Sequence, residues 1–239
     1  MSASRVEYPS LSKLNSEAIA CNLCPRLRRH CERIAKTKRR QFRDWEYWGR
    51  PLPGFGDPRA HLLILGLAPA AHGGNRTGRM FTGDGSAQFL MAALHKFKFA
   101  NQSTSENVGD GLKLKDAYMT AIVRCAPPKN KPNRKEIDIC QRYWTQEIKL
   151  LENVRVVLVL GRIAFDTYVR FLKTQNVDTK DLHFRHGAFF KLARPYPLLS
   201  ASYHPSRQNT QTGKLTTRMV DKVFKMIRDF LASPSSNIL

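Results

Sequence analysis

Acidic residues are scarce in this chain of 239 residues. Only 19 Asp and Glu side chains accompany 40 Lys and Arg side chains, so the formal net charge is +21 at pH 7. An excess of this size favours a polyanionic partner, because cations neutralise phosphates and release counterions whatever the base sequence. We therefore expect a nucleic-acid partner, and a merely basic, ribosome-associated protein is the alternative that composition leaves open.

Long apolar runs are also missing. No stretch is long enough to span a bilayer, and Met1-Ser-Ala-Ser-Arg5 has no apolar segment behind it. We expect a cytoplasmic monomer with no membrane partner, associated with the nucleoid when it binds DNA. The hydrophobic share of 42% is enough for one substantial core, and no fixed-period repeat is visible.

Strand and helix patterns alternate through most of the chain. The apolar patterns predict strands at 61–65, 118–123, 154–160 and 197–203, and helices at 10–20, 86–96, 134–151, 162–172 and 216–231. This alternation indicates a single three-layer α/β domain, in which a mostly parallel four-stranded sheet carries helices on both faces. We place this core at 59–232, after an N-terminal helical basic arm (1–58) and before a short tail (233–239).

Three polar loops follow predicted strands. The first, residues 66–84, contains five glycines and is called the pocket loop below; the others are residues 124–131 and the last loop, 204–213. Ligands of parallel sheets bind outside the carboxyl ends of the strands, and glycine lets the backbone approach a ligand closely. We expect the three loops to converge on one site.

The basic arm combines cations with aromatic residues. Residues 26–50 contain ten Lys or Arg and three acids, interleaved with Phe42, Trp45, Tyr47 and Trp48. A solvated helix face and a surface that binds nucleic acid both fit this composition.

The five cysteines are Cys21, Cys24, Cys31, Cys125 and Cys140. Disulfides are not expected in a cytoplasmic chain. Four thiolates suit either tetrahedral zinc or an iron–sulfur cluster, and their spacing does not choose between the two. A third possibility is that the cysteines are buried and unconnected.

Together these features resemble the family 5 uracil-DNA glycosylases. The resemblance rests on the pocket loop, on residues 123–131 (VRCAPPKNK), on residues 202–213 (SYHPSRQNTQTG) and on four cysteines in this order. It implies the uracil-DNA-glycosylase fold, and an enzyme that hydrolyses the N-glycosidic bond of uracil in DNA and leaves an abasic site. It also implies a [4Fe-4S] cluster bound by Cys21, Cys24, Cys125 and Cys140. The alternative is an inactive nucleic-acid-binding module of the same fold with a structural metal site.

Four residues are expected to carry the chemistry. A base must be flipped out of the duplex before it can be cleaved, and the departing base then needs a donor, which we assign to His204. The resemblance supports Asp84 as the carboxylate that directs water, although a helix N-cap is its alternative role. Asn209 and Asn130 are expected to read the edge of the base.

The remaining site residues divide into two groups. The base pocket is expected to be lined by Gly66, Leu67, Ala68, Pro69, His72, Asn75, Phe81 and Ala121. The DNA is expected to contact Arg76, Arg79, Lys129, Lys131, Ser206, Arg207 and Gln208. Phe81 is the expected stacking face, with a place in the core as its alternative.

Two positions depart from the pattern of related families. Leu67 and Ala68 stand where relatives carry an acidic residue or Asn in the turn after the first strand, and neither can activate water. Ala121 stands where sister families carry an Asn that reads the pyrimidine. We therefore expect selectivity to be relaxed, so that other deaminated or modified bases are removed besides uracil.

Overall fold

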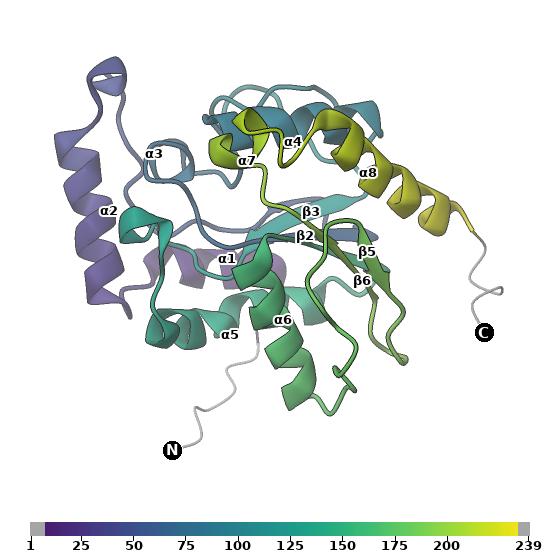
Figure 1. The fold of residues 1–239 in the computed structure, drawn as a ribbon. Helices are drawn as coiled ribbons and strands as arrows, with labels where there is room; N and C mark the ends of the chain where they lie inside the picture. The colour runs from purple at the N-terminus through teal and green to yellow at the C-terminus, as the bar shows by residue number, and fades with distance from the viewer. Residues whose placement is uncertain (1–7, 234–239) are drawn as a thin grey trace.

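The computed structural model describes residues 8–233, as an α/β body with an N-terminal arm packed against it (Figure 1). In chain order the elements are α1 (Leu11–Ala20), α2 (Pro25–Thr37), η1 (Arg40–Phe42), β1 (Phe55–Gly56), β2 (Leu62–Gly66), α3 (Gly74–Thr77), α4 (Gly85–Lys96), β3 (Ala117–Ala121), η2 (Pro128–Asn130), α5 (Arg134–Leu150), β4 (Val156–Leu160), α6 (Arg162–Thr174), β5 (Ala188–Phe190), β6 (Leu198–Ser202), α7 (Arg207–Gln211) and α8 (Thr217–Ala232).

The sheet has the strand order β1-β3-β2-β4-β6-β5. Its four central strands are parallel and are the four that the apolar runs predict. The two short outer strands, β1 and β5, pair antiparallel at the edges and raise the strand number from the predicted four to six. Strands of two and three residues are too short to produce a period-two pattern, which is why the sequence does not reveal them.

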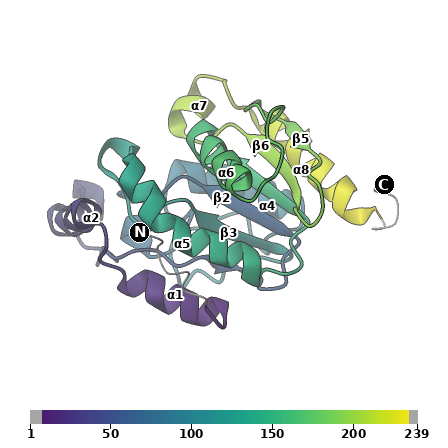
Figure 2. The ribbon, with the colours of Figure 1, turned by 90° about the horizontal axis from the view of Figure 1, so that it is seen from below.

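Side chains of the central strands alternate between two apolar cores. Leu62 and Ile64 face the layer of α4 and α8, whereas Leu63 and Leu65 face the layer of α1, α5 and α6. Figure 1 shows α4 and α8 on one side of the sheet, and Figure 2 shows α1, α5 and α6 covering the other. Because both faces are covered, each of the four central strands is buried along its whole length, and the predicted three-layer architecture is confirmed.

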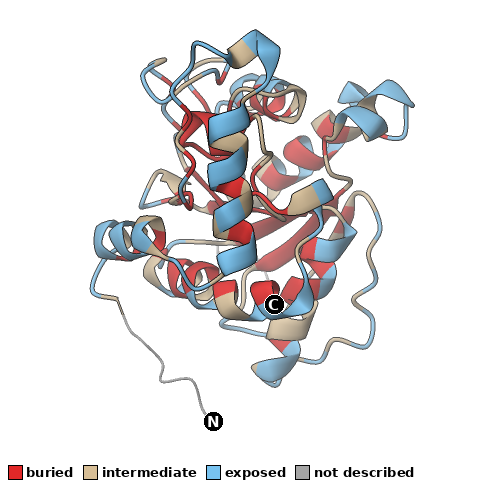
Figure 3. Ribbon diagram, turned by 90° about the vertical axis from the view of Figure 1, so that its left-hand side faces the viewer, coloured by how far each residue is buried: buried red, intermediate tan, exposed pale blue. Residues whose placement is uncertain are grey.

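The arm is part of this core. Leu14 and Ala18 of α1 and Leu27 and Cys31 of α2 are buried in the same cluster as the sheet, while the cations of α2 stay at the surface. Figure 3 shows the buried residues gathered in the sheet and on the inner faces of the helices. Strand β1 lies before residue 59, so the sheet begins inside the segment assigned to the arm.

The helix boundaries agree closely with the local signals. Asn133 caps α5 through a reciprocal pair of hydrogen bonds with Glu136, of 2.9 Å and 2.8 Å. Apart from Ser233, the predicted tail lies outside the described residues, as does the start of the arm. Within residues 8–233 no helix is both long and apolar enough to cross a bilayer.

Candidate functional site

A pocket opens at the carboxyl ends of β2, β3 and β6. Its lining comes from the pocket loop, the start of α4, the end of β3 and the last loop. This base pocket is bounded by Gly66, Ala68, Pro69, Ala70, Gly74, Met80, Phe81, Asp84, Ser86, Ala121 and His204. Two of the three predicted loops therefore converge. The segment 124–131 does not line the pocket and instead lies beside the arm, where Arg26 donates to Lys131 O over 3.3 Å.

Phe81 covers the floor of the base pocket. Its backbone has a φ of +46°, a left-handed conformation that turns the ring back over Gly66. A Cβ at Gly66 would lie 2.8 Å from the Phe81 ring, so only glycine permits this approach. The Phe81 and His204 rings face each other with centroids 6.4 Å apart and planes inclined by 31°.

Asp84 combines the two roles considered for it. Its Oδ1 accepts a 2.9 Å hydrogen bond from Ala87 N and so caps α4, and the same side chain lines the base pocket. Burial raises the pKa of this carboxyl above its usual value. The other oxygen, Oδ2, lies so close to Gly73 that a Cβ there would collide with it.

His204 follows β6 directly and borders the base pocket. Burial lowers the pKa of its imidazole to about 4, so the ring is neutral at neutral pH. The side chain of Asn209 does not reach the base pocket. Its Nδ2 donates a 2.8 Å hydrogen bond to His204 O and thereby fixes the backbone that carries the imidazole.

A second histidine supports the same turn and was not foreseen. His186 Nδ1 accepts from Tyr203 N at 3.2 Å, and its Nε2 lies 3.3 Å from Met219 O. Because Nδ1 accepts from a backbone N–H, the proton of the neutral ring belongs on Nε2. The ring also stacks on Tyr203, with centroids 5.1 Å apart. No sequence signal separates this histidine from an ordinary loop residue.

On the other side of His204 lies a larger groove of about 520 Å³. Its lining is Leu67, Leu160, Gly161, Arg162, Ile163, Ala164, Phe184, Tyr203, His204, Asn209 and Lys214. Leu67, predicted to line the base pocket, faces this groove. Arg162 and Lys214 make the groove basic, and both were missed. Gly161 follows β4, the third of the four parallel strands in chain order, so the rule that located the other loops also points to this one.

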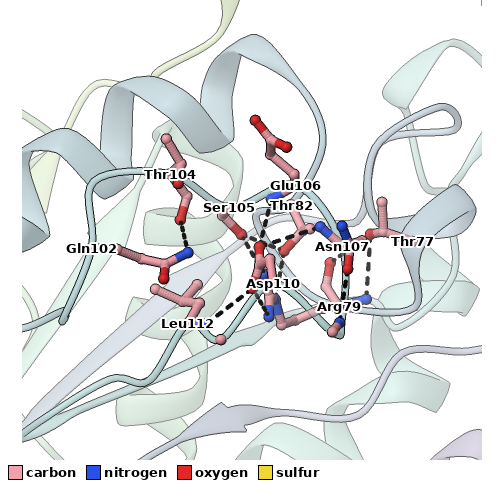
Figure 4. Close-up of polar contacts among 12 residues, drawn as sticks. Thr77, Arg79, Thr82, Gln102, Thr104, Ser105, Glu106, Asn107, Asp110 and Leu112 are labelled. Atoms are coloured by element: carbon pink, nitrogen blue, oxygen red, sulfur yellow. Dashed lines mark hydrogen bonds and ion pairs between the residues drawn. The ribbon is translucent and has the colours of Figure 1, made fainter.

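Arg79 is not available to DNA, contrary to the prediction. It is only 5% exposed and forms two hydrogen bonds with Asp110, of 3.0 Å and 2.7 Å, and others with Thr82 and Ser105. Figure 4 shows this network, which joins the pocket loop to residues 101–113. Burial alone would raise the pKa of Asp110, but Arg79 and three backbone N–H groups outweigh it and hold the pKa far below its usual range.

Arg76, Asn75 and His72 are likewise engaged inside the protein. Arg76 is 3% exposed and donates to His72 O and Gly83 O, each over 2.9 Å. Asn75 is buried and donates to Cys31 O over 3.3 Å. The His72 ring lies 3.0 Å from the Tyr47 hydroxyl. None of the three lines the base pocket, and their hydrogen bonds within the protein give no support to the predicted contacts with base or DNA.

The other predicted DNA contacts lie at the surface. Lys129, Asn130 and Lys131 are exposed, and Asn130 is not part of the pocket lining, contrary to its predicted role in reading the base. Ser206 caps α7 by accepting from Asn209 N over 3.4 Å. Arg207 and Gln208, which follow Ser206 in α7, are also exposed. Contact with DNA by these exposed side chains stays a prediction.

The cysteines lie where the arm meets the body. Burial and the neighbouring Cys21 and Cys125 raise the pKa of Cys24 to about 11, and burial raises that of Cys140 to about 12. The fifth thiol, Cys31, is buried and donates to Ala126 O over 3.5 Å. Among residues 8–233 no three His, Cys, Asp or Glu side chains are grouped closely enough to hold a metal ion.

Comparison with known proteins places the fold and the pocket in one family. The family model described as the uracil DNA glycosylase superfamily matches residues 53–228, most of the chain. The chain belongs to the uracil-DNA glycosylase superfamily. The match begins just before β1 and ends within α8, so it contains the whole sheet and every residue of the base pocket.

Relatives within the superfamily are similar over most of their length. The chain is 51% identical to the Type-5 uracil-DNA glycosylase of Thermus thermophilus over 201 residues, which cover 84% of this chain and 89% of the relative. It is 44% identical to the Type-5 enzyme of Mycobacterium bovis over 217 residues, covering 90% and 80%. For the Type-5 enzyme of Pyrobaculum aerophilum the identity is 39% over 209 residues, covering 87% of each chain.

Proposed function

We propose that this protein is a monofunctional DNA glycosylase that removes uracil from DNA and leaves an abasic site. The observation that carries the proposal is the base pocket, in which an aromatic ring, a neutral imidazole and a partly buried carboxylate face one small space. The Type-5 relatives, whose names state this activity, support it. A flipped nucleotide costs roughly a few kcal/mol of unstacking, which contacts with the protein must offset.

His204 acts on the departing base. As the bond between the sugar C1′ and the base nitrogen breaks, both electrons leave with the base, which becomes anionic. A neutral imidazole stabilises that anion by donating a hydrogen bond, and a low pKa keeps the ring neutral at the working pH. The Asn209 side chain and His186 hold the backbone on either side of the ring in place.

Asp84 acts on the sugar. The cationic C1′ that develops is stabilised by the nearby carboxylate, and a water oxygen then bonds to C1′ while its proton passes to Asp84 or to bulk water. The hydrogen bond from Ala87 N fixes the carboxylate at the start of α4. Since Leu67 and Ala68 cannot activate water, Asp84 is the carboxylate of the pocket lining that can do so.

The larger groove receives the sugar and phosphates of the flipped nucleotide. It adjoins the base pocket at His204, and the cations Arg162 and Lys214 lie on its wall. Phosphates next to the lesion would pair with them, and the surplus of Lys and Arg attracts the rest of the duplex.

Ala121 widens the range of bases that are removed. Its methyl group borders the base pocket and offers neither donor nor acceptor to the edge of a pyrimidine. The recognition that Asn130 and Asn209 were expected to share has no support in their positions. We propose that hypoxanthine and ethenocytosine are released as well as uracil, because no side-chain amide selects the base.

A [4Fe-4S] cluster held by Cys21, Cys24, Cys125 and Cys140 is part of the proposal. Four thiols are a complete ligand set for such a cluster. Burial raises the pKa of Cys24 and Cys140, so the positive charge of bound iron would stabilise the thiolates of these two residues. Cys21 and Cys24 of the arm and Cys125 and Cys140 of the body would hold the cluster. When bound, the cluster would tie the arm to the body.

A uracil-release assay on duplex DNA tests the activity. The wild-type protein should release uracil, whereas Asp84→Asn and His204→Ala should each lower the rate about a hundredfold or more with DNA affinity largely kept. Binding of DNA without release of any base by the wild type would favour the inactive binding module. Release of uracil alone from a panel with hypoxanthine and ethenocytosine would contradict the broad range.

The cluster has its own test. Anaerobically purified protein should contain iron and sulfide and absorb at about 400 nm, and Cys140→Ala should lose both signals. Stoichiometric zinc without that absorbance would contradict the cluster and leave the proposed activity untouched.

A further inference from the structure

Two aromatic side chains of the arm enclose an arginine of the pocket loop. The Cζ of Arg76 lies 3.9 Å from the centroid of the Phe42 ring and 4.0 Å from that of Trp45. The two rings meet edge to face with centroids 6.2 Å apart. Because Arg76 is almost fully buried, attraction between the cation and the rings is at the strong end of its range. We call these three residues the aromatic clamp.

The same guanidinium group joins two separate points of the pocket loop, the second of them next to its last residue. Its Nε donates to His72 O and its Nη2 to Gly83 O, both over 2.9 Å. Gly83 has a φ of +75° and immediately precedes Asp84, and a Cβ at this glycine would collide with Arg76 Nη2. Arg76 therefore fixes the backbone from which the Asp84 carboxylate projects.

Arg76 differs from an ordinary buried arginine. No ion pair involves it among residues 8–233, and its Nη1 has no hydrogen-bond partner there. The faces of Phe42 and Trp45 thus take the place of a carboxylate partner. Burial lowers the pKa of Arg76 and raises that of Asp84, and the attraction between the two charges opposes both shifts, so the charge of Arg76 still acts on Asp84.

Further contacts attach the same part of the arm to the loop. Trp48 N donates to Arg76 O and Gly49 N to Asn75 O, each over 3.0 Å. The Trp48 ring packs on Gly78, where a Cβ would approach it to 3.1 Å. The clamp is thus the side-chain part of a continuous contact between arm and pocket loop.

We propose that Phe42 and Trp45 are positioning residues of the base-removing reaction: they hold Arg76, and Arg76 holds Asp84 in place. The inference rests on the proposed function, because it assigns the arm a part in that same site. Neither aromatic ring lines the base pocket, so both act at a distance. A displacement of about 1 Å at a reacting group can cost about a hundredfold in rate, so the loss of a ring should be measurable.

Trp45 is the residue to change first. It is 37% exposed, so Trp45→Ala leaves no large internal cavity and the fold should persist. Trp45→Phe keeps an aromatic face over Arg76 and should restore most of the rate. Phe230→Ala is the matched control. It also removes a ring beside an arginine, since the Phe230 centroid lies 5.4 Å from Cζ of Arg155, but this pair is not part of the base pocket. Phe42→Ala tests the other face of the clamp.

Three measurements separate positioning from other roles. Single-turnover release of uracil at saturating enzyme gives the chemical rate, binding to a duplex with a tetrahydrofuran abasic site gives Kd, and a melting curve gives Tm. Trp45→Ala should lower the rate at least tenfold, with Kd within about threefold of the wild type and Tm lowered by only a few degrees, so that the protein stays folded at the assay temperature. Phe230→Ala should leave the rate unchanged.

The other outcomes overturn the inference. A wild-type rate in both Trp45→Ala and Phe42→Ala would show that the clamp does not position Asp84. A weaker Kd with an unchanged saturating rate would make Trp45 a simple DNA contact. A wild-type protein that releases no base would instead contradict the proposed function, so the two failures can be told apart.

Discussion

The pocket loop and the last loop each supply one reacting group, but they are held in different ways. The last loop is organised mainly by local contacts, besides its support from His186: Ser206 caps α7, and Asn209 donates to the backbone of His204, five residues earlier. The pocket loop is held by partners far away in the chain. Arg76 ties it to the arm and Arg79 ties it to residues 101–113. A glycine-rich loop gains its order from outside, because its own residues supply little packing.

The strongest way to break this arrangement is to remove the partner of Arg79. Asp110→Ala leaves a cation uncompensated in the interior, and we expect a loss of about 3–5 kcal/mol in the free energy of unfolding. Urea denaturation measures it. Asp138→Ala is the control, because it removes the exposed partner of Arg134 on α5 and should cost at most about 1 kcal/mol. Equal losses in the two variants would contradict the anchoring role of Asp110.

The last loop has a pH dependence of its own. The pKa of His204 is about 4 in the folded protein against 6.5 for an unperturbed histidine, so the unfolded chain binds more protons between these pH values. The contribution of His204 to the free energy of unfolding is therefore fully present above about pH 6.5. It decreases as the pH falls toward 4, and about 2 kcal/mol is lost at pH 5. Urea titrations at pH 7 and pH 5 should show a smaller decline in His204→Gln than in the wild type.

The control for that titration is His183→Gln, which changes an exposed histidine on the loop before β5. It should decline with pH as the wild type does. If His204→Gln declined just as steeply, the acid sensitivity would arise from other groups, and the imidazole would not be held neutral by burial.

The pocket loop can also be disturbed without touching its anchors. Gly73→Ala places a Cβ against Asp84 Oδ2, and since Gly73 has a φ of −99° the clash is its main effect. We expect at least about a tenfold loss in the single-turnover rate, because the carboxylate must move. Gly109→Ala, which meets only Asn107 Oδ1 at 3.4 Å, should keep the wild-type rate. Equal rates would mean that Asp84 adapts freely.

The smallest effect is expected where support is local. Asn209→Ala removes one hydrogen bond to His204 O, worth about 1 kcal/mol, while Ser206 and the rest of α7 still hold the turn. The uracil-release rate should fall only a few-fold. A loss as large as that of His204→Ala would show that Asn209 touches the substrate, as first expected, and would remove the contrast between the loops.

The same contrast explains what the sequence could predict. Apolar runs define the four central strands, and Asn133 with Glu136 defines the start of α5, because these signals lie within a few residues of the structure they specify. The predicted positions of His204 and Asp84 at the pocket agree with the structure. His204 comes just after the apolar run of β6, and Asp84 is the N-cap residue before α4, so both are located by signals a few residues away. Family resemblance, not composition, supplied their roles.

Arg76, Arg79 and Asn75 were misjudged for the opposite reason. In a basic chain an arginine in a polar loop resembles a DNA contact, and nothing nearby in the sequence announces Asp110 or Trp45 as its partner. Burial of a polar side chain depends on residues 31 to 44 positions away in these cases, and such pairings appear only in the fold. The basic groove at Arg162 could have been found by extending the strand-end rule to β4.

The two anchoring arginines also limit how this site can be engineered. A loop that is held mainly by its own residues could be transferred to another scaffold as one segment. The last loop, with its α7 turn, comes close to this case. In a new scaffold the pocket loop would bring two buried cations, Arg76 and Arg79, without the partners that stabilise them here: Asp110, Phe42 and Trp45. Transplanting the pocket loop therefore means transplanting three segments of the chain together: residues 40–49, 66–86 and 101–113.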